Sequence, residues 1–462
     1  MRTRGTIDRV ERATNFRRFD GLNLLASPDL LEVQSVNMKY LTNPFLSVLL
    51  CTCFASAADW PQFRGPNRDG KSLETGLLKQ WPDDGPKLLR TITGFGQGYA
   101  TPAISGERIY ISGKVGDDLK LFCFDLLGQK LWEKTHGLAF RESDAPHSPY
   151  PGSRAAPTID GDTLYLLGGL GKLNAYRTRD GELLWTVDVV KDLAGRVPPW
   201  GYTESVLIDG NNLICTPGSV TKGTFAALNK KTGQVVWQSG GITARAEYGS
   251  PILIEYDGVR QVVTMSRAGL VAVSPEDGKF LWQYNRMAKT PMAESNTAHG
   301  NSAAYADGYV FEATAYQTRG GCAVHLKSNG SEVTSELAWQ SDKLNCEHGG
   351  YVVVDGYIYM SQGAGWSCLE LKTGKERWSG RGPGKGSIIY AEGMLYCLGE
   401  DGRMGLIEAR PNEFNQVSVF ALPEGEGRCW THPVINDGKL YLRWGDKLHV
   451  YELHNQARTT RP

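Results

Sequence analysis

The sequence of 462 residues lacks an excess of charge of either sign. It contains 50 Lys and Arg residues against 50 Asp and Glu residues, so its formal net charge is zero. A neutral chain has no overall attraction for nucleic acid or for an anionic membrane, and we expect no nucleic-acid partner. The sequence also lacks an apolar run of the roughly 20 residues that a membrane helix requires. We therefore expect no transmembrane segment in the mature chain.

The motifs of several cofactor and metal enzymes are missing as well. The sequence has no adjacent cysteine pair, no CxxC, no haem-attachment motif and neither HxH nor HExxH spacing. Most cysteines beyond the first 58 residues lie in apolar strand patterns, where a thiol behaves as a small hydrophobe. Their odd number excludes complete pairing but leaves one or two disulfides open; they are Cys123, Cys215, Cys322, Cys346, Cys368, Cys397 and Cys429.

The first 58 residues differ from the rest of the chain. The apolar run Leu41–Phe54 follows Met38 and Lys39, and it precedes the small-x-small sequence Ala55-Ser56-Ala57. This order is typical of a secretory signal peptide. We expect a leader over residues 1–57, with the signal peptide at about 38–57 and residues 1–37 either untranslated or a basic extension. The mature protein is then exported to the periplasm or the extracellular space.

What the sequence does contain is a repeat rich in glycine. The chain has 55 glycines and 10% aromatic residues, which suits an all-β fold with many turns. A strand, a turn glycine and a second strand recur in eight copies. The turn glycines are Gly106, Gly161, Gly210, Gly258, Gly308, Gly356, Gly393 and Gly438.

A second signal places a tryptophan four residues after another turn glycine. It recurs about every 40–50 residues, the period of a four-stranded propeller blade. A buried indole removes a large apolar surface from water, so we assign these tryptophans to docking between blades rather than to ligand binding. They are Trp132, Trp185, Trp237, Trp282 and Trp378; Trp339 holds the same place in a longer, irregular copy, and Phe420 takes the place of the next.

The eighth unit, Thr431 to Leu453, supplies only three strands before the pattern ends. The segment Pro86–Ile92 matches a tryptophan-bearing outer strand, with Arg90 in the place of the indole. We expect this segment to close the ring, because closure removes an edge that would otherwise template aggregation. The prediction is an all-β, eight-bladed propeller of four-stranded antiparallel blades over residues 86–453, preceded by an extended segment (58–85) and followed by a disordered tail (454–462).

The repeat Ala227-x-Asn229-x-x-Thr232-Gly233-x-x-x-Trp237 resembles the tryptophan-docking repeat of the pyrroloquinoline-quinone (PQQ) propellers. Cys368-x-Glu370-x-x-Thr373-Gly374-x-x-x-Trp378 is a further copy. The segment Asp59–Gly70 resembles the opening of bacterial PQQ-binding-like repeat proteins. The resemblance covers about residues 86–453 and implies the propeller fold.

The family that this resemblance indicates divides by function. One branch contains quinoprotein dehydrogenases, and another contains non-catalytic propellers similar to the outer-membrane protein assembly factor B lipoproteins. Methanol-type dehydrogenases carry an adjacent cysteine pair and long insertions, which this chain lacks. The resemblance therefore implies a monomeric binding or scaffolding module for envelope polypeptide, glycan or a small polar ligand, with no cofactor expected. The alternative is a dehydrogenase of alcohols or sugars that uses PQQ and Ca²⁺.

The residues that precede the first strand of each blade form the candidate site. Such loops meet at the channel of a propeller, where a rigid scaffold holds functional side chains. We predict a ligand-binding rim there and assign no catalytic or metal-binding residue; the alternative is that these side chains bond loop backbones and fill the channel. The candidates are Tyr99, Arg154, Trp200, Glu204, Arg245, Glu247, His299, Asn301, Glu347, His348, Lys385, Trp430 and His432.

Overall fold

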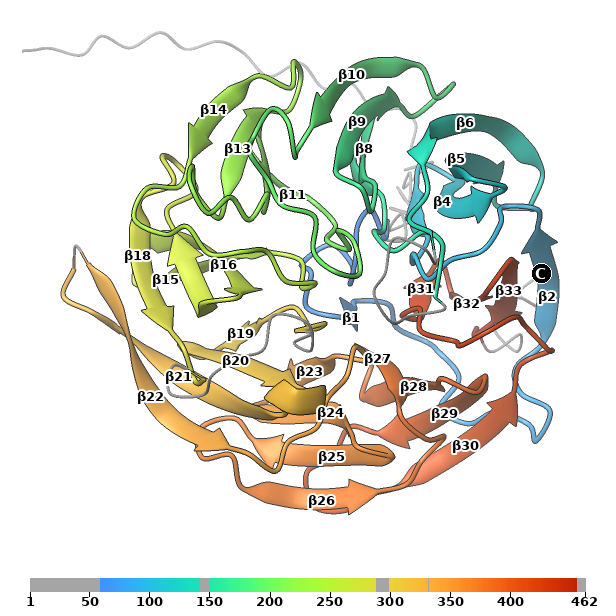
Figure 1. Cartoon of the computed structure of the whole chain (residues 1–462). Coiled ribbons are helices and arrows are strands. Elements are labelled where there is room, and N and C mark those ends of the chain that lie inside the picture. The colour runs from blue at the N-terminus through green and yellow to red at the C-terminus, as the bar shows by residue number, and fades with distance from the viewer. Residues whose placement is uncertain (1–58, 142–149, 288–298, 331, 455–462) are drawn as a thin grey trace, which may run out of the picture. The chain divides into compact units, whose positions relative to one another are not determined.

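The computed structural model of the protein describes residues 59–141, 150–287, 299–330 and 332–454. These residues form eight sheets arranged in a ring, each with four antiparallel strands, and one sheet carries an additional short strand (Figure 1). The predicted all-β, eight-bladed propeller is confirmed. The predicted leader, and the predicted tail apart from His454, lie outside the described residues. No helix within the described ranges is long and apolar enough to cross a membrane.

The first four blades follow one another in chain order. Blade 1 contains β3 (Ala103–Ser105), β4 (Arg108–Val115), β5 (Asp118–Asp125) and β6 (Lys130–Leu138). Blade 2 contains β7 (Thr158–Asp160), β8 (Thr163–Leu167), β9 (Lys172–Arg177) and β10 (Leu183–Asp188). Blade 3 contains β11 (Leu207–Asp209), β12 (Asn212–Cys215), β13 (Ala226–Asn229) and β14 (Val235–Gln238). Blade 4 contains β15 (Ile252–Tyr256), β16 (Val259–Ser266), β17 (Gly269–Val273) and β18 (Phe280–Tyr284).

The remaining blades complete the ring. Blade 5 contains β19 (Ala304–Ala306), β20 (Tyr309–Thr314), the 3₁₀ turn η2 (Tyr316–Thr318), β21 (Gly320–Ser328) and β22 (Val333–Ser341). Blade 6 contains β23 (Tyr351–Val354), β24 (Tyr357–Gln362), β25 (Gly365–Glu370) and β26 (Glu376–Gly380). Blade 7 contains β27 (Gly386–Ala391), β28 (Met394–Gly399), β29 (Arg403–Glu408) and β30 (Gln416–Ala421), with β1 (Lys71–Ser72) beside β27. Blade 8 contains β31 (Val434–Asn436), β32 (Lys439–Trp444), β33 (Lys447–Glu452) and β2 (Leu88–Thr93).

Burial differs between the middle and the outer strands of a blade. All five residues of the middle strand β17 are buried, whereas the outer strand β10 keeps most of its residues exposed or half-buried. A middle strand has a neighbouring blade on each face, so it reads as a continuous apolar run rather than as an alternating one. The turn between β15 and β16 shows the local requirement for glycine, because Asp257 and Gly258 both have positive φ, at 50° and 76°.

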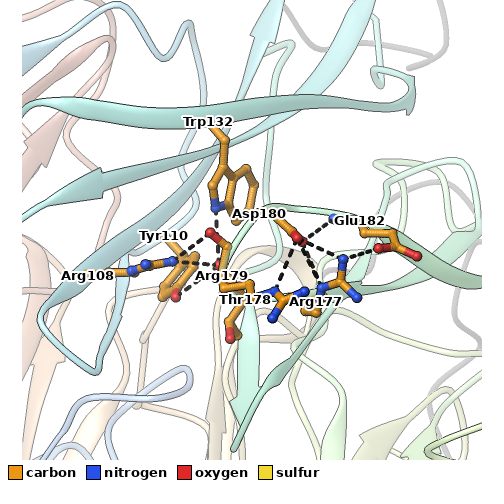
Figure 2. A network of polar contacts seen from close by, with 8 residues as sticks. All are labelled: Arg108, Tyr110, Trp132, Arg177, Thr178, Arg179, Asp180 and Glu182. Atoms are coloured by element: carbon orange, nitrogen blue, oxygen red, sulfur yellow. Dashed lines mark hydrogen bonds and ion pairs between the residues drawn. The ribbon is translucent and has the colours of Figure 1, made fainter.

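The tryptophans dock each blade onto the next. In Figure 2 the indole of Trp132, in blade 1, donates its Nε1–H to the carbonyl oxygen of Thr178 in blade 2 at 3.1 Å. The side chain of Arg108 donates to the same carbonyl group at 3.2 Å. A Cβ atom on the turn residue Gly181 would lie 2.8 Å from the ring of Trp132. The turn therefore needs glycine so that the indole can lie flat against the neighbouring blade.

The same contact recurs around the ring. The indole nitrogens of Trp185, Trp237, Trp339 and Trp378 donate to the carbonyl oxygens of Lys230, Pro275, Leu371 and Arg410 in the next blade. Trp282 is the exception, since its indole donates to Gln261 within its own blade. We call these six tryptophans, with the turn glycines that four of them cover, the docking belt; the glycines are Gly181, Gly233, Gly278 and Gly374.

The last blade is closed by the N-terminal strand, as predicted. β2 pairs with β33, and Arg90 stands opposite Val450 just after a bulge, as Trp185 stands opposite Ala175. The guanidinium group of Arg90 donates to the carbonyl oxygen of Leu126 in blade 1, where other blades use an indole. Phe420 covers Gly85, since a Cβ there would lie 2.5 Å from its ring. The closing strand is thus held to the next blade as most of the other outer strands are, by a side chain that donates to a backbone carbonyl group.

The segment before β2 crosses the ring and joins distant blades; we call residues 59–72 the axial segment. Trp60 pairs with Ile104 of blade 1, and β1 runs parallel to β27 of blade 7 near the centre of the ring (Figure 1). The buried Arg68 donates to the carbonyl oxygens of Ser205 and Val206 in blade 3. Arg64 donates to the carbonyl oxygen of Tyr351 in blade 6. The segment therefore ties four blades together across the axis.

The question of disulfides is answered for the described residues. All seven cysteines beyond the leader are free and buried. Burial raises the pKa of the Cys123 thiol to about 12, so it stays protonated at neutral pH. These side chains serve as small apolar packing groups.

Candidate functional site

The loops that enter the innermost strands meet around a cavity of about 670 Å³. Its size lies within the range usual for small-molecule sites. Residues from seven blades and from the axial segment line it. They are Phe63, Tyr99, Thr101, Tyr150, Arg154, Trp200, Thr203, Ser205, Tyr248, Ser250, Gly300, Tyr316, Gln317, Glu347, His348, Trp430 and His432.

Trp430 is the centre of one wall of the cavity. Its ring centroid lies 5.1 Å from that of Tyr99, 4.6 Å from that of Tyr150 and 4.4 Å from that of His348. The His348 ring meets the indole at 85°, edge to face. Such pairs hold aromatic rings in fixed orientations, so this wall is preformed.

A second aromatic pair lies elsewhere on the cavity lining. Trp200, before β11, and Tyr248, before β15, have ring centroids 5.9 Å apart. Phe63 of the axial segment meets His432 edge to face at 5.0 Å. Tyr, Trp and Phe rings from the axial segment and from six blades therefore surround the same space.

Arg154 brings a positive charge to the cavity lining. Its guanidinium carbon lies 6.0 Å from the ring centroid of Tyr99 and 5.2 Å from that of Phe140. One terminal nitrogen donates to the carbonyl oxygen of Tyr150, and the buried Nε has no hydrogen-bond partner among the described residues. Burial lowers the pKa of Arg154, but a guanidinium remains charged at neutral pH.

A network of charged groups lies beside the Trp430 wall. Lys385 bridges Glu347 at 2.8 Å and Glu400 at 3.4 Å. The indole of Trp430 donates to Glu400 at 3.0 Å, and the Tyr316 hydroxyl donates to Glu347 at 3.3 Å. These residues, apart from Tyr316, line a narrow recess adjoining the cavity. The network fixes Trp430 and leaves neither carboxylate without a cation.

The structure brings together part of the predicted rim. Tyr99, Arg154, Trp200, Glu347, His348, Trp430 and His432 line the cavity, and Lys385 lines the adjoining recess. The remaining candidates do not line it and instead make contacts within the fold. They are Glu204, Arg245, Glu247, His299 and Asn301.

Glu204 and Asn301 brace the loops from behind. Glu204 is buried and accepts hydrogen bonds from the backbone N–H and the hydroxyl of Thr216. Burial raises the pKa of Glu204 to about 7, although the Thr216 N–H and the charge of Arg68 act in the opposite direction. The Asn301 amide donates to three carbonyl oxygens, including that of Glu347, and its oxygen accepts from Gly350. Both side chains hold loop backbones in place.

Glu247, Arg245 and His299 do not line the cavity either. Glu247 forms an ion pair with Arg267 at 3.1 Å and accepts the backbone N–H of His299. The carbonyl oxygen of Arg245 accepts the N–H of Arg267. His299 is fully buried, and burial lowers its pKa to about 3, so its ring is neutral at physiological pH.

The two histidines of the cavity are also held neutral. Burial lowers the pKa of His432 to about 3 and lowers that of His348 below its usual value. Within the described residues, no group of three His, Cys, Asp or Glu side chains is placed to hold a metal ion. The charge of the cavity therefore comes from Arg154 and from the Lys385 network.

Sequence reasoning missed several aromatic residues of the cavity. Tyr150 and Tyr248 lie within six residues of a predicted rim residue, and a wider window before each inner strand would have included them. Tyr316 follows β20 and has a φ of 59°, a left-handed conformation unusual for an aromatic residue. Phe63 belongs to the axial segment, and no repeat signal placed that segment across the ring.

A family model described as outer membrane protein assembly factor BamB matches residues 117–355, just over half of the chain. The chain belongs to this family. The BamB of Moranella endobia is 23% identical over 306 residues, which cover 63% of this chain and 74% of that protein. The BamB of Yersinia pestis is 24% identical over 307 residues, with the same coverage. The predicted resemblance to PQQ-like propellers of this type is confirmed.

Solved structures of BamB and of dehydrogenases share the fold. The BamB of Moraxella catarrhalis matches with a TM-score of 0.56 at 13% identity, over 81% of this chain and 99% of that one. The quinohemoprotein alcohol dehydrogenase of Comamonas testosteroni matches with a TM-score of 0.65 at 12% identity, over 87% and 82%. At such low sequence identities, the structural similarity shows only that these proteins share the propeller fold. The choice between binding and catalysis rests on the site of this BamB-family chain.

The rim carboxylates do not fit a site for Ca²⁺ and PQQ. Such a site needs several oxygen ligands free to converge on the ion. Glu204 is turned into the fold toward Thr216, Glu247 pairs with Arg267, and Glu347 pairs with Lys385. The amide of Asn301 is used by loop carbonyl groups. The chemistry of a bound quinone therefore has no prepared ligand set among these candidates.

Proposed function

We propose that this protein is a non-catalytic binding or scaffolding propeller, whose ligand occupies the aromatic cavity. The observation that carries the proposal is the cavity itself, a space of about 670 Å³ with aromatic walls and few charged groups. Largely apolar lining with a few placed polar groups is the usual character of a ligand site. The ordered ring contacts around Trp430 mean that little side-chain freedom is lost on binding.

The expected ligand is an envelope polypeptide, a glycan or another small polar molecule. The curated relatives carry the name of outer membrane protein assembly factors, which supports a role among envelope proteins. The leader-like sequence that ends near Ala57 supports export. N-terminal sequencing of the exported protein should begin near Asp59, and a full-length cytoplasmic protein would contradict this part of the proposal.

The rival function is a PQQ- and Ca²⁺-dependent dehydrogenase of alcohols or sugars. The chain shares its fold with a quinohemoprotein alcohol dehydrogenase, so the dehydrogenase function requires an experimental test. The engagement of Glu204, Glu247 and Glu347 within the protein favours the binding function. We therefore propose that the protein works without a cofactor.

One experiment separates the two functions. The purified protein is mixed with PQQ and Ca²⁺, dialysed, and assayed for retained quinone and for dye reduction with alcohols and aldoses. We expect neither stoichiometric retention nor turnover. Retention of one quinone per chain together with turnover would overturn the binding function. A Trp430→Leu variant in the same assay shows whether any retained quinone lies in the aromatic cavity.

A further inference from the structure

We infer that the cavity binds the end of an acidic oligosaccharide, whose chain continues into a groove at blades 6 and 7. This inference rests on the proposed binding function and names its ligand class. The ligand would carry carboxylate or sulfate groups on sugar rings. Three features support this assignment: an arginine without a carboxylate partner, aromatic rings on the cavity walls, and a neighbouring groove that carries arginines.

The first feature is the charge on the cavity lining. Arg154 forms no ion pair within the described residues, and its single hydrogen bond goes to the carbonyl oxygen of Tyr150. A guanidinium group presents five N–H donors in a planar fork that matches a carboxylate. Glu347 and Glu400, which line the cavity and its recess, form their ion pairs with Lys385 and Arg428 and not with Arg154. An acidic group on the ligand would supply the missing partner.

The second feature is the arrangement of aromatic rings. Tyr99 and Tyr150 flank Trp430, while Trp200 and Tyr248 form a separate pair. The C–H faces of a pyranose ring are flat and apolar, so they can pack on such surfaces while the hydroxyl groups point away. Tyr316 keeps a strained backbone and an exposed ring at the cavity, an arrangement that often marks a functional position.

A polypeptide would find fewer partners in the cavity. Backbone N–H groups at the base of the loops already bond to hydroxyl groups of the next blade: Ala156 to Ser205, Ser205 to Ser250, and Ser250 to Ser302. Peptides bound as added strands depend on free main-chain groups at a sheet edge. The donors offered to a ligand here belong mainly to side chains, which suits the hydroxyl and acidic groups of a sugar.

The third feature is a second groove beside the cavity. Glu347, His348 and Trp430 line both the cavity and the adjoining recess. Lys385 and Glu400 line both this recess and a groove of about 730 Å³ on blades 6 and 7. The recess itself, of about 10 Å³, is too small for a sugar ring, so a chain of linked sugars would cross its mouth over the half-exposed Lys385 rather than pass through it.

The groove carries basic residues suited to the later sugar units. Arg381 and Arg403 line it, both are exposed, and neither forms an ion pair among the described residues. Arg428 lines it as well and contacts Glu400 at 3.3 Å. The groove also contains Glu376, Glu400 and Asp401, so its four cations outnumber its anions by only one. Such a small excess of positive charge favours a chain with one acidic group per unit over a compact polyanion.

The test uses the purified full chain and isothermal titration calorimetry at low ionic strength. The probes are a hexamer and a trimer of galacturonic acid, a neutral glucose hexamer, and a hexaglutamate peptide. We expect the acidic hexamer to bind most tightly, and the neutral hexamer to bind about tenfold more weakly or worse because it leaves Arg154 unpaired. Added salt should weaken binding of the acidic hexamer, because exposed charges are screened.

Matched variants locate the binding site. Arg154→Gln should weaken both acidic oligomers about tenfold, whereas Arg154→Lys, which keeps the charge but loses the fork, should weaken them less. Arg403→Gln should weaken the hexamer about threefold and leave the trimer unchanged, since only the longer chain reaches the groove. Arg377→Gln, on the outer strand β26 and paired with Glu370, is the control and should change neither. Thermal melting confirms that each variant is folded.

Several outcomes would overturn the inference. Equal binding of acidic and neutral hexamers, or unchanged binding by Arg154→Gln, would show that the cavity does not select acidic sugars. Preferred binding of hexaglutamate would assign the site to acidic polypeptides instead. Absence of binding by every probe would reject the ligand class, while the proposed binding function would still be judged separately by the quinone assay.

Discussion

The docking belt and the cavity rim are built from the same repeat, yet they differ in how that repeat is used. In the belt, one contact recurs with little variation, and four of the six indoles cover a turn glycine as Trp185 covers Gly233. On the rim, equivalent positions hold different residues, such as Tyr99, Arg154 and Trp200. Packing between like blades imposes one chemistry on the belt, whereas a single ligand requires a different group from each blade.

The two regions also differ in what their indoles face. The belt tryptophans, whether buried as Trp237 is or half-buried as Trp185 is, pack between blades, whereas Trp200 and Trp430 of the rim are half-buried around an open cavity. Substitution in the belt should therefore cost stability, and substitution on the rim should cost binding. The following predictions test this distinction.

The largest effect should follow deletion of residues 59–93, which removes the axial segment and β2. The deletion exposes the edge of β33 and removes Trp60 and Ile92 from the core. We expect loss of cooperative unfolding and concentration-dependent association, measured by circular dichroism and size-exclusion chromatography with light scattering. A shorter deletion of residues 59–72 leaves β2 in place and should keep the ring closed. A monomeric long-deletion protein with a normal melting curve would contradict the role of β2.

Trp237→Ala tests the belt directly. Its indole fills the space between blades 3 and 4 and donates to Pro275 at 3.2 Å. The cavity left behind should lower the free energy of unfolding by about 3–5 kcal/mol, measured by urea denaturation. Trp200→Ala is the matched rim variant, for which we expect about 1 kcal/mol or less and loss of ligand binding. The reverse pattern, with binding lost in the first and stability lost in the second, would refute the assignment of the two regions.

Gly278→Ala and Gly258→Ala separate backbone strain from docking in one blade. The two glycines have φ of 70° and 76°, so alanine suffers the same left-handed strain of about 1–2 kcal/mol at both. At Gly278 the new Cβ would also lie 2.5 Å from the ring of Trp237, whereas at Gly258 nothing lies within 4 Å. We expect Gly278→Ala to cost about 1–3 kcal/mol more in urea denaturation. Equal costs would mean that the turn glycines are required for their conformation alone.

Much of the fold could be predicted from the sequence because its causes are local and repeated. Five of the six docking tryptophans follow a turn glycine at a fixed spacing of four residues, and Arg90 and Phe420 fill belt positions where tryptophan is absent. The axial segment could not be placed in this way. Its arginines reach carbonyl groups of Ser205 and Tyr351, far away in the sequence, and no periodic pattern records such contacts.

The candidate site could be predicted only in part, since proximity to an inner strand does not determine the direction of a side chain. Trp200 and Glu204 lie on the same loop, but Trp200 lines the cavity while Glu204 turns into the fold toward Thr216. Asn301 lies at a rim position and yet bonds only backbone groups. The sequence identifies the loops that meet at the axis. It does not show which side chains of these loops bond to backbone carbonyl and N–H groups, and only the remaining side chains can line the cavity.

The smallest effect should come from Glu204, a rim candidate that braces the fold. Burial raises the pKa of Glu204 to about 7, well above that of an unfolded chain. The folded protein therefore holds this proton more tightly, so its contribution to stability is full below about pH 4.5 and is lost as the pH rises through 7. Glu204→Gln keeps an oxygen acceptor for the Thr216 N–H but has no proton to lose. The free energy of unfolding of the wild type, relative to this variant, should fall by about 1–2 kcal/mol between pH 5 and pH 8.

Urea denaturation at several pH values measures the difference, and Glu413→Gln, at an exposed position, serves as the control. Parallel pH profiles of wild type and Glu204→Gln would show that the carboxyl is as well solvated in the fold as in the unfolded chain, and would return Glu204 to the list of groups open to a ligand.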